Sequence, residues 1–171
     1  MHARLSDYKK EFDQTMPIQK GIKIIAENRK AFHDYYIDER FEAGVALSGT
    51  EVKSLRAGKV NLRDSYCQVK DGEMFLIGVH ISPYENGNRF NLDPDRTRKL
   101  LMQKREIIRL YSKTKEDGLT LVPTKCYFKD SKVKFEIGLA RGKKDYDKRD
   151  VEAQKQAKRD IDRAVKNRNN R

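Results

Sequence analysis

The sequence contains no tryptophan, and it has only two cysteines and four prolines among its 171 residues. Cys67 and Cys126 lie far apart with no CxxC spacing, which indicates reduced, buried thiols and not a disulfide framework or a metal site. No apolar run approaches the roughly 18 residues of a membrane span, and residues 1–20 lack the apolar stretch of a signal peptide. We therefore expect a cytoplasmic protein that does not enter a membrane.

Catalytic motifs are also missing from the chain. There is no P-loop, no GxGxxG, no HExxH and no GxSxG, and none of the three histidines has a cysteine or second histidine at ligand spacing. Carboxylates such as Asp34 and Asp38 could form an acid and base pair, but carboxylates this common usually make a solvated strand face. We expect a protein that is not an enzyme and that holds neither a cofactor nor a metal.

Positive charge is in clear excess. Lysines and arginines number 38 against 26 aspartates and glutamates, so the net charge is +12. A surface of this sign attracts phosphate groups and releases their counterions on binding, which predicts a polyanionic partner. Composition alone leaves RNA, DNA and an anionic membrane open. The length fits one domain with tails, since domains cluster near roughly 100 to 150 residues.

Apolar alternation and turn signals predict a mainly β protein. Asp71-Gly72 accepts the positive φ angles of a type I′ turn and joins the clearest hairpin in the chain. In a second hairpin, Phe135 and Ile137 alternate toward the core. Strands are predicted over residues 22–26, 35–47, 65–70, 73–81, 119–128 and 132–140.

Two main helices are expected between these strands. Ser48 and Glu51 have the spacing of a capping box, which predicts a short helix ending near Gly58. A second helix is predicted over 93–118, because Pro94 suits a first turn and apolar residues recur at spacings of three to four. These apolar residues are Leu100, Leu101, Ile107, Ile108 and Tyr111. The element order predicts a six-stranded antiparallel barrel of the oligonucleotide-binding type, flanked by the two helices.

Composition divides the chain into three segments. Residues 1–21 have sparse apolar residues and are expected to form a mobile arm. Residues 22–142 carry the material for the barrel, and residues 143–171 form a basic tail with almost no large apolar residue. Apolar residues such as Val151 and Ile161 recur in the tail at helical spacings. We therefore expect a tail that is disordered alone and becomes helical on a polyanion.

Aromatic residues lie near loops among the cations. Tyr84, Phe90 and Tyr127 could stack on unpaired bases, although packing on the core is the more usual role for each of them. A run of cations within 93–118 would usually be a solvated helix face. Positive charge recurs in 125–134 and in the tail, which weakens that interpretation.

Seven blocks of sequence resemble one bacterial family. In order they are IIAENRKA at 24–31, FEAG at 41–44, EVKSLR at 51–56, DSY at 64–66, ISPY at 81–84, RTRKLL at 96–101 and GKKDYDKR at 142–149. Together they resemble the SsrA-binding protein family, small protein B. The resemblance begins near Ile22 and leaves the first 21 residues outside it.

The resemblance implies an oligonucleotide-binding-like barrel and a cytosolic adaptor. That family binds the tRNA-like domain of transfer-messenger RNA and brings the charged RNA, with elongation factor Tu, to stalled ribosomes. Elongation factor Tu would then be reached indirectly, through the RNA, by a chain expected to be a monomer. The positions that the resemblance implies for RNA binding are Asn28, Glu42, Arg98, Lys99, Leu101 and Lys134.

The resemblance also implies a role for the tail. In the family the tail enters the vacant messenger channel near the decoding centre and becomes helical among the ribosomal RNA. The matching tail residues are Lys143, Lys144, Tyr146, Asp147, Lys148, Arg149, Ala164 and Val165. Two departures stand out: Phe128 occupies a position where tryptophan is common, and Ala164-Val165 are smaller than the usual apolar pair.

Two other functional classes compete with the adaptor. An enzyme acting on RNA lacks catalytic groups in this sequence. A structural ribosomal protein fits the composition equally well, and only the seven blocks favour the adaptor over it.

Overall fold

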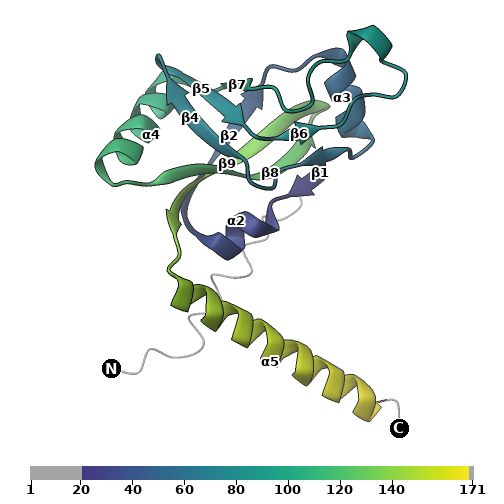
Figure 1. Ribbon diagram of the computed structural model, residues 1–171, viewed down its shortest axis with the longest axis vertical. Coiled ribbons are helices and arrows are strands. Elements are labelled where there is room, and N and C mark those ends of the chain that lie inside the picture. Colours follow the sequence, from purple (N-terminus) through teal and green to yellow (C-terminus); the bar gives the residue numbers. More distant parts are fainter. Residues whose placement is uncertain (1–20, 170–171) are drawn as a thin grey trace.

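The computed structural model describes residues 21–169 (Figure 1). Its strands are β1 (Ile22–Glu27), β2 (Tyr35–Val45), β3 (Val60–Asn61), β4 (Tyr66–Lys70), β5 (Glu73–Ile77), β6 (His80–Ile81), β7 (Arg98–Leu101), β8 (Thr120–Lys129) and β9 (Lys132–Gly142). Its helices are α2 (Arg29–Asp34), α3 (Gly49–Arg56), the 3-10 turn η1 (Asn88–Phe90), α4 (Lys104–Glu116) and α5 (Asp145–Asn169).

Six antiparallel strands close into a ring. They follow the order β8, β4, β5, β7, β2 and β9, and β9 pairs back with β8. β1 also pairs with β8 but lies outside this ring. The predicted six-stranded antiparallel barrel is confirmed, with one change of membership: β7 stands in the ring where the first strand was expected.

Alternating side chains of the strands fill the barrel. Phe135, Ile137 and Leu139 of β9 are almost fully buried, as their spacing predicted. Leu55 of α3 and Leu110 of α4 join the same core, so both helices lie against the barrel (Figure 1). Because a closed ring has no free edge among its members, the core and the backbone pairing hold each strand in register.

The helix predicted over 93–118 is wrong in its first half. Arg98 and Leu100 are buried while Lys99 and Leu101 are exposed, which is the two-residue period of a strand. β7 pairs with both β2 and β5, and α4 begins only after it, at Lys104. Four residues are too few to reveal their period beside a longer helical pattern. Tertiary pairing overrides the local preference for helix.

Local turn and cap signals are confirmed. Ser48 and Glu51 form the capping box of α3, with the Glu51 backbone N–H donating to Ser48 Oγ and the Ser48 N–H donating to Glu51 Oε2. Asp71 and Gly72 have φ angles of 52° and 73°, as the turn between β4 and β5 requires. The short helix α2 was not predicted, because its six residues show no apolar period.

α5 leads away from the barrel toward the C-terminus (Figure 1). It has 25 residues, and most of those from 145 to 167 are exposed. The structure thus has a continuous helix over the segment expected to be disordered until bound, and folding on a polyanion stays a prediction.

The predicted arm over 1–21 lies outside the described residues except for Gly21. Within 21–169, no helix has the length and apolar content needed to cross a membrane.

Candidate nucleic-acid interface

An open groove of about 840 Å³ lies on the outer surface of the barrel. β2, β7 and β9 line it together with the β4–β5 turn and the start of α4. Four of the six residues predicted to bind RNA line this groove: Glu42, Lys99, Leu101 and Lys134. Residues from three separate parts of the sequence therefore meet at one surface.

Strand register explains why these residues share a face. Gly44 of β2 pairs with Leu101 of β7 on one side and with Lys134 of β9 on the other. Directly paired residues of antiparallel strands point to the same face, as do residues two apart along one strand. Glu42 is two residues from Gly44, and Lys99 is two residues from Leu101. All five therefore lie on the outer face.

Gly44 keeps the floor of the groove low. A Cβ atom at this position would lie 3.3 Å from Leu101 Cβ, so a larger residue would press on the leucine. Leu101 itself is 54% exposed, although it neighbours the buried Leu100. An exposed leucine between a carboxylate and lysines provides an apolar surface on which an unstacked base or a ribose can pack.

Glu42 is held in place by two donors. The Tyr127 hydroxyl donates to Glu42 Oε2 at 2.6 Å, and Lys129 Nζ lies 3.1 Å from both carboxylate oxygens. Burial raises the pKa of Glu42, but the bonds from Tyr127 and Lys129 and the charge of Lys134 outweigh it and lower that pKa. Glu42 is therefore a carboxylate at neutral pH, with lone pairs left to accept hydrogen bonds from base amino groups.

Tyr127 does not offer its ring to a base. It is 7% exposed, and burial and the bond to Glu42 raise the pKa of its hydroxyl. Its role is to orient Glu42. The sequence did not reveal the roles of the groove residue Gly44 and of Tyr127, which bonds to Glu42, and the only signal was their position in the alternation of β2 and β8.

Asn28 does not line the groove. Its side chain is buried and caps α2, where Oδ1 accepts a hydrogen bond from the Ala31 N–H at 3.1 Å. Its amide nitrogen donates to the carbonyl oxygens of Leu62 and Pro123, each at 3.0 Å. With both donors and its acceptor engaged inside the protein, Asn28 fixes α2 against the barrel.

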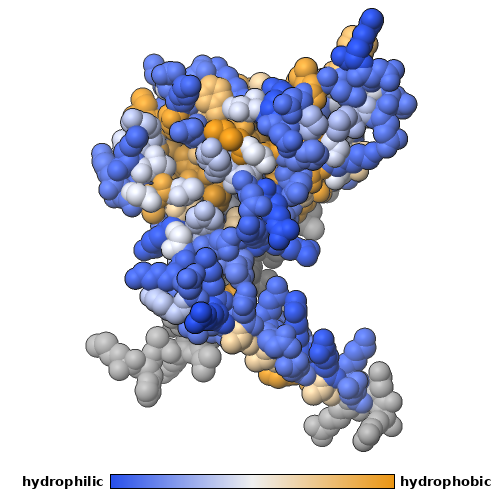
Figure 2. Space-filling view, viewed as in Figure 1, coloured by the Kyte–Doolittle hydropathy of each residue, from blue (hydrophilic) through white to orange (hydrophobic). Residues whose placement is uncertain are grey.

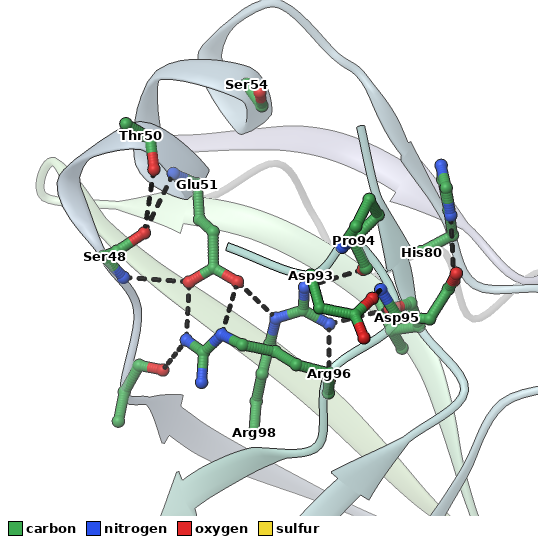
Figure 3. Close-up of polar contacts among 12 residues, drawn as sticks. Ser48, Thr50, Glu51, Ser54, His80, Asp93, Pro94, Asp95, Arg96 and Arg98 are labelled. Atoms are coloured by element: carbon green, nitrogen blue, oxygen red, sulfur yellow. Dashed lines mark hydrogen bonds and ion pairs between the residues drawn. The ribbon is translucent and has the colours of Figure 1, made fainter. Parts of the chain in front are cut away.

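Arg98 is also internal, and Figure 3 shows its partners. Its side chain is fully buried and donates to Glu51 Oε1 at 2.8 Å and to the Val79 carbonyl at 2.7 Å. Further bonds reach the carbonyls of Pro94 and Arg96. The Arg96 guanidinium pairs with the same Glu51 carboxylate, so one carboxylate joins α3 to the start of β7.

Glu51 is the centre of this network. Burial raises its pKa, but the bonds from Arg96, Ser48 and Arg98 outweigh it and lower the pKa. A buried charge is tolerated only when it is paired and hydrogen-bonded, and each partner here satisfies that requirement. The network anchors the strand that presents Lys99 and Leu101 to the groove. Arg98 therefore supports the groove by fixing β7, whereas the hydrogen bonds of Asn28 hold α2 and reach no residue that lines the groove.

The tail residues form a separate surface. Lys143 Nζ lies 4.9 Å from the centre of the Tyr36 ring and donates to the Phe32 carbonyl at 3.1 Å. Burial lowers the pKa of Lys143. The Lys144 N–H donates to Asp147 Oδ2 at 3.2 Å at the start of α5. Of the predicted tail residues, the half-buried ones are Lys143, Asp147 and Lys148, and the exposed ones are Lys144, Tyr146, Arg149, Ala164 and Val165.

One side-chain contact joins α5 to the body of the protein further along. His33 Nε2 of α2 lies 2.9 Å from Glu152 Oε1, while His33 Nδ1 lies 2.8 Å from Asp34 Oδ1. Both hydrogen bonds raise the pKa of His33, and the bond to Asp34 has the larger effect. Nothing in the part of the chain that the structure describes forms a group of three metal-ligating side chains.

Comparisons with known proteins agree with one family. The model of the SmpB protein family matches residues 25–167. The SsrA-binding protein of Carboxydothermus hydrogenoformans is 62% identical over 144 residues, which cover 84% of this chain and 97% of that protein. The SsrA-binding protein of Bacillus cytotoxicus is 58% identical over 153 residues, covering 90% and 98%.

A solved structure agrees as well. It is described as "tmRNA-SmpB: a journey to the center of the bacterial ribosome" and is similar with a TM-score of 0.60 and 55% identity. The match covers 70% of this chain and 85% of that one.

Proposed function

This chain belongs to the SmpB protein family, and from that membership we propose that it is an RNA-binding adaptor of trans-translation. It binds transfer-messenger RNA and acts with it on the ribosome. The members of this family are RNA-binding adaptors. We propose on this basis that the present protein has no catalytic activity. Because ribosomes are its place of action, we assign it to the cytoplasm.

The observation that carries the RNA-binding role is the row across the groove. Leu101, Gly44 and Lys134 lie side by side on three strands, with Glu42 and Lys99 in the same face. An apolar contact, an acceptor and two cations then meet within one groove. This combination suits the tRNA-like domain of the RNA, whose unstacked bases need packing and hydrogen bonds and whose phosphates need charge.

The tail has a second role in this proposal. α5 carries exposed cations and a thin apolar stripe, and it projects away from the groove (Figure 1). We assign it to the vacant messenger channel, where ribosomal RNA phosphates surround its cations. An occupied channel would exclude it, so the tail senses a missing message. The adaptor works as a monomer, and elongation factor Tu reaches it only through the shared RNA.

Binding of an isolated tRNA-like domain transcript tests the groove. Leu101→Ala and Lys134→Ala should each weaken binding about 5- to 150-fold, because a stacked base or a charged hydrogen bond contributes about 1–3 kcal/mol. Lys23→Ala is the matched control, since it removes the same charge from an exposed position on β1, outside the groove. Equal weakening by Lys23→Ala and Lys134→Ala would mean that binding depends on the overall positive charge and not on the groove. That result would refute the site.

A further inference from the structure

The loop between β6 and β7 has a fixed shape. Asn91 closes it: its Oδ1 accepts from the Tyr84 N–H at 3.0 Å and its Nδ2 donates to the Tyr84 carbonyl at 2.9 Å. A Cβ atom at Gly87 would collide with the Asn91 side chain, so the glycine makes room for this closure. Thr50 Oγ1 of α3 donates to the Phe90 carbonyl at 3.3 Å. The loop is thus held at both ends and against α3.

Phe90 is displayed at the surface of this loop. It is 67% exposed, the largest exposed fraction among the large hydrophobic residues of the described part of the chain. The Arg89 guanidinium lies 5.1 Å from the centre of its ring. A folded loop that keeps a phenylalanine in water gains free energy when a partner covers the ring, and its fixed shape leaves little ordering cost to binding.

Cations lie on this loop and on the helix beside it. Arg89 lies next to the Phe90 ring, and Lys53 Nζ of α3 lies 5.3 Å from the ring centre of Tyr84, at the start of the loop. Two carboxylates of this region are engaged within the protein, because Glu85 pairs with Lys59 and Glu51 lies buried in the arginine network. Figure 2 shows this part of the surface as a projection in which an apolar patch lies among hydrophilic residues. An exposed ring among cations suits a nucleic-acid base with its phosphates.

We propose that this loop is a second contact for the tRNA-like domain, in which Phe90 stacks on an unpaired base and Arg89 and Lys53 meet the adjoining phosphates. This inference rests on the proposed RNA-binding function. The loop runs directly into β7, which lines the groove, and it lies at the opposite end of the molecule from α5 (Figure 1). The RNA bound in the groove is therefore within reach of this loop. The tail, in the proposed function, lies in the messenger channel of the ribosome.

The absence of native tryptophan allows a direct test of stacking. F90W places a single indole at the proposed contact, and Y111W places one on α4, where Tyr111 is 45% exposed but outside both the groove and the loop. Stacking on a base quenches indole fluorescence. Titration with the tRNA-like domain transcript should quench F90W strongly and leave Y111W nearly unchanged.

Affinity measurements complete the test. F90A should weaken binding about 10-fold, and F90Y, which keeps the ring, should bind within about 2-fold of the natural chain. If the natural chain binds the transcript while F90W is not quenched and F90A binds normally, the loop contact is wrong and the function stands. Quenching by ribosomes alone, and not by the transcript, would also overturn it. A natural chain that does not bind the transcript would refute the proposed function itself, and the loop contact with it.

Discussion

The groove and α5 both carry lysines proposed to meet RNA, yet the protein holds them in opposite ways. Each groove strand is paired on both sides within a closed ring, and the core beneath is fully buried. α5 follows β9 and is tied to the body by Lys143, just before the helix begins, and by Glu152 within it. A surface that binds a folded RNA needs side chains in fixed positions. A segment that enters the messenger channel only when the channel is empty needs length and freedom to move.

The energetics of the two regions differ for the same reason. Burial of large side chains offsets the ordering of the barrel strands, while Tyr146, Ile161 and Val165 of α5 remain 60%, 62% and 54% exposed. Ordering costs about 1–2 kcal/mol per backbone residue, so a helix with so little burial needs another source of stability. Phosphates around its cations would supply one, in line with the proposal that α5 gains its stability on the ribosome.

The largest effect is expected from breaking the support of the groove. Glu51→Ala should lower the free energy of unfolding by about 3–5 kcal/mol, because it leaves the fully buried Arg98 without its counter-charge. Urea unfolding measures this loss. Glu73→Ala is the matched control, since Glu73 pairs with Lys99 at the surface and its loss should cost about 1 kcal/mol or less.

The same network predicts how acid acts on the barrel. The pKa of Glu51 is lowered in the folded protein, so its contribution is present above the unfolded pKa of about 4.3 and is lost as the pH falls through the folded value. Urea unfolding of the natural chain and of Glu51→Ala should therefore converge in acid. A constant difference between the two at all pH values would contradict this role.

The next effect concerns the tail. Replacing Val151, Ile161 and Val165 with glycine should disfavour the helix by about 3 kcal/mol in total relative to alanine at the same positions, at roughly 1 kcal/mol per glycine. Trans-translation in a reconstituted reaction with stalled ribosomes should fall sharply, while binding of the tRNA-like domain stays unchanged. Replacing the same three residues with alanine removes the same side chains but keeps a strong helix former at each position, and it serves as the control. Full activity of the glycine variant would show that helix formation in the tail is not needed.

A smaller effect is expected when the tail is removed, and it tests whether the groove alone binds the tRNA-like domain. For the natural chain, the logarithm of affinity for the tRNA-like domain should fall linearly with the logarithm of salt concentration, by about 0.7–0.9 per phosphate contact. A chain ending at Arg141 should keep nearly the same slope and affinity, because the groove lies entirely before that residue. A flat salt response, or loss of binding on truncation, would place the contacts elsewhere.

The smallest effect is expected at the contact between His33 and α5. The hydrogen bonds to Asp34 and Glu152 raise the pKa of His33. The contact is therefore complete below the unfolded pKa of about 6.5 and is lost as the pH rises through the raised folded value. NMR titration of the ring should show a lower pKa in Glu152→Gln, with part of the rise kept by Asp34. An identical titration curve in Glu152→Gln would mean that α5 does not rest on α2.

Local patterns in the sequence were sufficient for the elements whose signals are short in range. The capping box at Ser48 and Glu51, the Asp71-Gly72 turn and the alternation of β9 each depend on neighbouring residues, and each was predicted. The segment from Arg98 to Leu101 was not, because its strand exists only through pairing with β2 and β5. Its short alternation could not compete with the helical spacing that follows.

The sequence by itself determined the net charge, the turns, most of the strands and, through its seven blocks, the family. Only the tertiary structure separated the site residues by role. It brought Glu42, Lys99, Leu101 and Lys134 together in one groove and placed Asn28 and Arg98 inside. The reason is physical: exposure and contact depend on which strands pair across long separations in the chain. Composition and spacing cannot register those pairings.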